Sequence, residues 1–61
     1  MTTDLPEPLR RTIFAALVAA QDAGASVPTS RLAVAKQHNI DVDVVRRIER
    51  EGLDREWPPL E

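Results

Sequence analysis

Cysteine is absent from this sequence, histidine occurs once, and there are only two glycines. Without thiols the chain has no disulfide and no thiolate ligand for a metal, and one imidazole does not build a zinc centre. No glycine-rich phosphate loop and no pairing of a nucleophile with a base is visible. The chain is also too short to wall a substrate pocket. We therefore expect no metal, no cofactor and no enzymatic activity.

A long apolar run is also missing. The longest one, residues 13–20, is eight residues long and rich in alanine, whereas a membrane-spanning helix needs roughly 20 residues. The first residues lack the basic segment of a signal peptide. We therefore expect a soluble cytoplasmic protein that makes no use of a membrane.

An excess of positive charge is missing as well, since ten acidic residues stand against eight basic ones in a chain of 61. A domain of this size buries only about 60% of its unfolded surface, so the chain can form one small domain of marginal stability. Proteins that grip nucleic acid usually carry a positive excess. The acidic charge balance argues against strong non-specific binding of nucleic acid, although it is compatible with a local basic patch.

What is present is a stretch, residues 29–51, that predicts two short helices joined by a tight turn. Ala35 is small enough to let a second helix cross closely. Asn39 tolerates the left-handed conformation with which helices often end, and Asp41 can cap the second helix by accepting backbone N–H groups. The other apolar residues of this unit point into the core: Ile40 from the turn, and Val45 and Ile48 from the second helix.

The spacing of these residues resembles the helix-turn-helix of bacterial DNA-binding proteins. In that pattern a small residue is followed four positions later by a turn residue and then by an aliphatic one, with two further apolar positions five and eight residues on. The chain fills these slots with Ala35, Asn39, Ile40, Val45 and Ile48. The resemblance covers about a third of the chain. It implies a three-helix bundle of the small bacterial or phage regulator type.

We predict a flexible N-terminal arm, residues 1–7, and a single all-α domain, residues 8–61. Pro8 suits the first turn of a helix, and Gly24 suits the position just past a helix end. The three helices of the predicted bundle cover about residues 8–23, 30–37 and 42–51.

Both later helices need boundaries of their own. Thr29 or Ser30 would cap the second helix, with Val27 extended before it and tucked beneath it. Gly52 would end the third helix, and a one-turn helix could follow in the C-terminal tail. Trp57 would fold back over the bundle from that tail, and docking to a partner is its alternative role.

The first helix is apolar over more than half its circumference, along a stripe that starts at Leu9. Such a width suits the central core helix of the bundle or, alternatively, a dimer face. The expected core residues are Ile13, Leu17, Leu32, Ala35, Ile40, Val45, Ile48, Leu53 and Trp57.

If the chain binds DNA as the resemblance implies, its last helix lies in the major groove, where arginine can fork onto guanine or clamp phosphate. It would act as a homodimer, because one short helix gives little affinity alone, and serve as a transcriptional regulator or an accessory factor of recombination. The base-contact candidates are Val42, Asp43, Arg46, Arg47 and Arg50. The phosphate-contact candidates are Arg10, Arg11, Arg31 and Lys36.

The acids of the same helix oppose DNA binding, since four of them accompany three arginines between Asp41 and Glu51. Val42 and Val44 would be partly exposed although they are apolar, and they could touch a thymine methyl or form the apolar centre of a protein contact. The acids favour a protein-interaction module that keeps the fold and joins a larger assembly. Its docking surface would consist of the two valines and the tail, residues 57–60. The sequence leaves both functions open.

Overall fold

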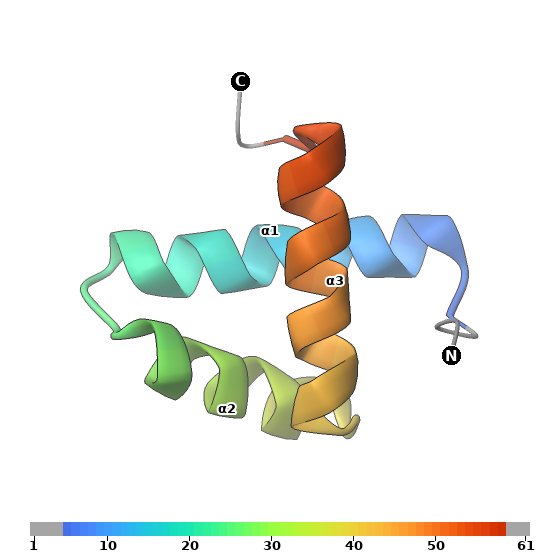
Figure 1. The fold of residues 1–61 in the computed structure, drawn as a ribbon. Helices are drawn as coiled ribbons and strands as arrows, with labels where there is room; N and C mark the ends of the chain where they lie inside the picture. The colour runs from blue at the N-terminus through green and yellow to red at the C-terminus, as the bar shows by residue number, and fades with distance from the viewer. Residues whose placement is uncertain (1–4, 59–61) are drawn as a thin grey trace.

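The computed structural model describes residues 5–58, which form three helices: α1 (Glu7–Asp22), α2 (Val27–His38) and α3 (Val42–Arg55). Every helix packs against the other two, which confirms the predicted all-α three-helix bundle. In Figure 1, α2 lies beneath α1, and α3 crosses in front of both. None of the helices between residues 5 and 58 combines the length and the apolarity that a membrane span requires.

The structure corrects part of the predicted N-terminal arm. Leu5 packs against the core, its carbonyl accepts a hydrogen bond from Arg10 Nη1 at 2.6 Å, and α1 already begins at Glu7. Residues 1–4 of that arm, and residues 59–60 of the predicted docking tail, lie outside the described residues.

All three helices end in the same type of turn. The residue that stops each helix has a positive φ, namely Gly24 (105°), Asn39 (54°) and Glu56 (52°). The residue after it donates its backbone N–H to a carbonyl five positions back: Ala25 to Ala20, Ile40 to Ala35, and Trp57 to Gly52. This is the Schellman arrangement, which satisfies carbonyls that the helix leaves unpaired. It confirms the predicted roles of Gly24 and Asn39.

The start of α2 differs from the prediction. The helix begins at Val27, and its cap is Ser26, whose Oγ accepts the backbone N–H of Thr29 at 3.3 Å. Pro28 is compatible with this start because the first helical N–H groups have no partner within the helix. Val27 is therefore part of the first turn and 42% exposed, and Ser30 is a fully buried residue inside the helix.

The end of α3 also differs. The helix passes through Gly52 and continues to Arg55, so no separate one-turn helix follows it. Gly52 is buried where α3 crosses α1, and a Cβ atom at this position would overlap the ring of Phe14. The glycine therefore serves close approach of the two helices rather than helix termination. Asp41 caps the start of α3 as predicted, accepting the backbone N–H of Asp43 at 3.0 Å.

The core lies where the three helices meet. Trp57 folds back from the end of α3, as predicted, and its ring meets that of Phe14 edge-to-face with 6.1 Å between centroids. Ile40 packs against this core from the turn. The buried apolar residues are Ile13, Phe14, Leu17, Val34, Ala35, Val45, Ile48 and Trp57.

Two leucines that were expected in the core are exposed, Leu32 (61%) and Leu53 (54%), and Leu9 at the start of the apolar stripe of α1 is 37% exposed. Leu32 lies two residues from both Ser30 and Val34, which are buried, and a step of two residues leads to the opposite side of a helix. In α3 the apolar contact of the final turn comes from Trp57, which leaves Leu53 on the surface.

Candidate nucleic-acid interface

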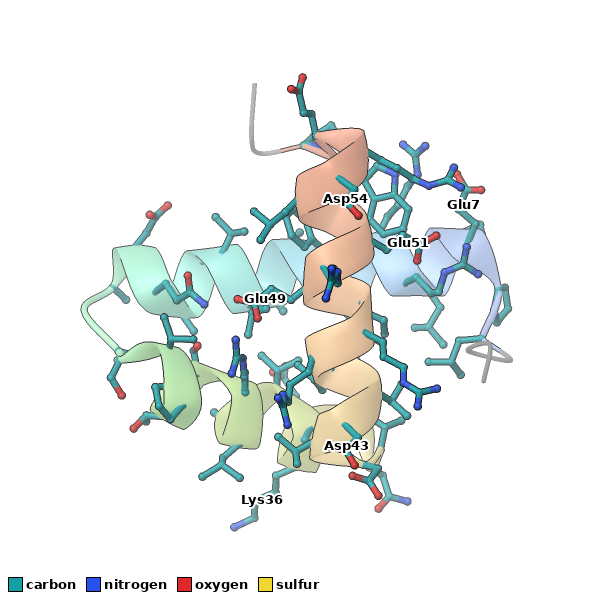
Figure 2. The ribbon with its side chains drawn as sticks, viewed as in Figure 1. Glu7, Lys36, Asp43, Glu49, Glu51 and Asp54 are labelled. Carbon is teal, nitrogen blue, oxygen red and sulfur yellow. The ribbon has the colours of Figure 1, made fainter. Side chains whose placement is uncertain are left out.

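One face of α3 points away from the bundle. Its side chains recur every three or four residues, so they share one side of the helix, while Val45, Ile48 and Gly52 occupy the buried side. The exposed residues of this outward face are Asp43, Arg46, Arg47, Arg50, Leu53 and Asp54. Figure 2 views α3 from this side, with Asp43 and Asp54 near its two ends.

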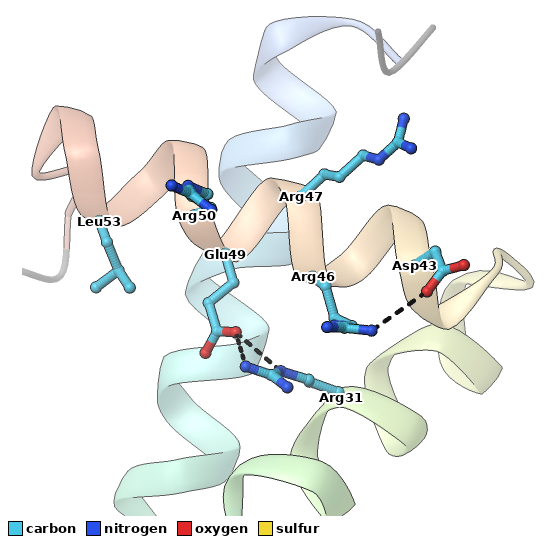
Figure 3. Close-up of a pocket in the computed structure, with 7 residues that line it drawn as sticks. All are labelled: Arg31, Asp43, Arg46, Arg47, Glu49, Arg50 and Leu53. Atoms are coloured by element: carbon cyan, nitrogen blue, oxygen red, sulfur yellow. Dashed lines mark hydrogen bonds and ion pairs between the residues drawn. The ribbon is translucent and has the colours of Figure 1, made fainter. Parts of the chain in front are cut away.

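A hollow of about 670 Å³ lies along the outward face, where α3 borders α2 (Figure 3). Four arginines and two carboxylates line it, a net charge of +2 (four minus two), in a chain whose formal net charge is −2. The lining residues are Arg31, Asp43, Arg46, Arg47, Glu49, Arg50 and Leu53. Positive charge is thus concentrated on this side of α3 even though the whole chain is acidic.

Glu49 lies on the flank of α3 that faces α2. Its Oε1 accepts a hydrogen bond from Nε of Arg31 at 2.9 Å and lies 2.7 Å from Nη2 of the same guanidinium. Its Oε2 accepts a longer bond, 3.4 Å, from the amide of Gln21 on α1. The same amide donates to the hydroxyl of the buried Ser30 at 3.1 Å. A polar network therefore joins all three helices at the edge of the hollow.

Glu51 lies on the opposite flank of α3, toward α1 (Figure 2). Its two carboxylate oxygens accept parallel hydrogen bonds from Nε and Nη2 of Arg10 at 2.9 and 3.1 Å. The hydrogen bond to Glu51 raises the pKa of the Arg10 guanidinium above its ordinary value. Arg55, one turn further along α3, approaches the same carboxylate at 3.7 Å.

The phosphate-contact candidates do not gather on one surface. Arg10 is held by Glu51, and Arg11 stacks over the Trp57 ring at 5.2 Å from its centroid while pairing with Glu7. Lys36 is exposed on α2 and points away from the hollow (Figure 2). Of these four candidates, only Arg31 lines the hollow.

The base-contact candidates are mostly brought together. Arg46, Arg47 and Arg50 all lie on the outward face, and Arg46 approaches Asp43 at 3.5 Å with both side chains exposed. Val42 does not join them, because it and Val44 are half-buried and pack against the core.

Two residues of the hollow, Glu49 and Leu53, were absent from the predicted site. Glu49 pairs with a residue 18 positions away, a separation that no local pattern reveals. Leu53 could have been found only by knowing that α3 continues beyond Gly52.

No family model matches this chain, and no curated protein or solved structure matches it either. Within residues 5–58 no group of three or more histidine, cysteine, aspartate or glutamate side chains is placed to hold a metal.

Proposed function

We propose that this chain is a small helix-turn-helix DNA-binding protein that presents the outward face of α3 to the major groove. The observation that carries the proposal is the placement of Arg46, Arg47 and Arg50 together on that face, beside a hollow of net positive charge. α2, the turn at Asn39 and α3 would form the helix-turn-helix, with α3 as the recognition helix.

The acids of α3 oppose DNA binding less than their number suggests. Glu49 and Glu51 lie on the flanks and hold arginines of α2 and α1, and Asp41 caps the helix. Asp43 remains on the outward face, where it pairs loosely with Arg46. An exposed pair of this kind contributes only about 0–1 kcal/mol, so Arg46 can leave it for a phosphate or a guanine at little cost.

We further propose that the protein acts in the cytoplasm as a homodimer, and that it regulates transcription or assists recombination. One helix with three arginines on its outward face offers few contacts, and specific complexes usually bury more surface than one such module supplies. A second copy would double the phosphate contacts and read two half-sites.

The first test is binding to a random-sequence DNA duplex, followed by fluorescence anisotropy across a salt titration. Wild-type binding should weaken steeply with salt, because each phosphate contact releases counterions. Arg46→Ala/Arg47→Ala should bind more weakly. The slope of log K against log salt concentration should become shallower by about 0.9 for each phosphate contact that is lost. The melting temperature of this variant should stay nearly unchanged, because both side chains are exposed.

The matched control is Arg55→Ala, which removes an equally exposed arginine from the same helix. Arg55 lies toward Glu51, off the outward face, so its loss should change affinity far less than the double substitution. Absence of wild-type binding at low salt would contradict the proposal. Equal affinity of wild type and the double variant would mean that α3 does not contact DNA through these arginines.

A protein-interaction module is the second candidate, and one observation favours it: Leu53 is 54% exposed and lines the same hollow. Three residues of the surface predicted for this role are poorly available, since Val42 and Val44 are half-buried and Trp57 is 3% exposed. A partner would instead meet Leu53 and the neighbouring arginines. Leu53→Gln should then abolish partner binding, whereas it should leave the salt dependence of DNA binding unchanged.

A further inference from the structure

We infer that Glu49 is a positioning residue, which holds one edge of the Arg31 guanidinium so that its other edge meets a backbone phosphate of bound DNA. The inference rests on the proposed DNA-binding function. It assigns a role in binding to Glu49, one of the acids of α3 whose number argues against DNA binding. It makes Arg31 and Glu49 a single unit at the border of α2 and α3.

The geometry of the pair leaves part of Arg31 available. A guanidinium carries five N–H groups in a rigid plane. Glu49 engages the side edge, through Nε and Nη2, which leaves the end edge, with N–H groups on Nη1 and Nη2, for a second oxyanion. That edge presents two parallel donors, the arrangement with which arginine grips phosphate. Both residues line the hollow (Figure 3).

Glu49 is itself held in place. Its side chain is 14% exposed and that of Arg31 is 29% exposed, and the amide of Gln21 reaches the second carboxylate oxygen. Gln21 is anchored in turn on the hydroxyl of Ser30, which is completely buried. The carboxylate therefore fixes Arg31 relative to α1 and α3 before any ligand arrives, and an ordered side chain loses less freedom on binding.

The charge of Glu49 acts in the opposite direction, because a carboxylate beside a phosphate repels it. The phosphate would lie across one guanidinium from the carboxylate, closer than the roughly 8 Å over which physiological salt screens charges, so the repulsion persists and opposes the benefit of an ordered arginine. The positioning role of Glu49 requires that orientation outweigh this repulsion. Replacing the Glu49 carboxylate with an amide should lower DNA affinity if orientation of Arg31 dominates, and raise it if repulsion of the phosphate dominates.

The test is a double-mutant cycle with wild type, Glu49→Gln, Arg31→Ala and the double variant, measured by anisotropy on the random-sequence duplex near 150 mM salt. Glu49→Gln should weaken binding by roughly two- to tenfold, which corresponds to ordering one long side chain on binding, with an unchanged salt dependence. Arg31→Ala should make the slope of log K against log salt concentration shallower by about 0.9, because one phosphate contact is lost. In the Arg31→Ala background, Glu49→Gln should no longer weaken binding.

Equal or tighter binding of Glu49→Gln would overturn the inference, and so would an equal loss in both backgrounds. Glu49→Asp keeps the charge but shortens the side chain, so it should also weaken binding; wild-type affinity for this variant would overturn the positioning role even if Glu49→Gln failed to fold. Circular dichroism checks the fold of every variant. A wild-type chain that binds no duplex at low salt would overturn the proposed function and this inference together, whereas binding by wild type with unaffected Glu49 variants would overturn the inference alone.

Discussion

At the residue scale, Gly52 shows how one missing side chain determines a helix crossing. The residue is buried in α3, and a Cβ atom there would overlap the ring of Phe14, which is itself completely buried on α1. The ring cannot move aside into solvent. Glycine inside a helix normally costs about 1 kcal/mol relative to alanine, so its presence here reflects the space that Phe14 requires.

Gly52→Ala should therefore destabilise the domain by about 1–3 kcal/mol through overpacking, although helix propensity alone predicts a gain of stability. Thermal unfolding followed by circular dichroism measures the difference. Phe14→Leu/Gly52→Ala is the matching control, because a smaller side chain at position 14 relieves the overlap, and its loss should be less than the sum of the single losses. A higher melting temperature for Gly52→Ala would mean that the two helices are further apart.

At the scale of the elements, the crossing of α2 and α3 depends on Ala35. Its side chain is 7% exposed, and its carbonyl accepts the N–H of Ile40 at 2.9 Å, which closes the turn between the helices. Ala35→Leu should destabilise the domain by about 1–3 kcal/mol, because the larger side chain forces the helices apart. Ala33→Leu is the control, since it makes the same change on the exposed side of α2. Similar melting temperatures for the two variants would contradict this packing.

The same elements show what the sequence could predict. The αL residue Asn39, the cap Asp41 and the buried Val45 and Ile48 all follow from local spacing, because each depends on neighbours within a turn or two. The start of α2 does not follow from the sequence, because Ser26 and Thr29 are both chemically able to cap a helix. The exposure of Leu32 does not follow either, because residue type, without a packing partner, does not determine the buried side of a short helix.

The role of a glycine and the direction in which a charged side chain faces depend on contacts that are distant in the sequence. A glycine occurs at helix ends and also where backbones approach closely, and only the position of Phe14 distinguishes these roles for Gly52. Likewise, the count of acids in α3 carried no information about which side each one faces. Glu49 and Glu51 meet arginines 18 and 41 residues away, and such contacts exist only once the helices have packed.

At the scale of the whole molecule, residues 5–58 form one small core, and Trp57 completes it. A 61-residue protein has a typical free energy of unfolding of about 3–9 kcal/mol. Trp57 is 3% exposed, packs edge-to-face on Phe14 and lies beneath the Arg11 guanidinium. The Trp57 side chain therefore supports both the core and the junction of α1 with α3.

Trp57→Ala should cost about 3–5 kcal/mol, a large part of the typical stability of a domain of this size, so we expect its unfolding transition to shift strongly toward lower urea concentration. Circular dichroism at the helix band, with a urea titration, measures the loss. Pro58→Ala is the control, because its side chain is exposed at the next position and its replacement should leave the transition almost unchanged. A cooperative transition near that of wild type for Trp57→Ala would show that the three helices form a sufficient core without the tail, and that Trp57 is available to a partner.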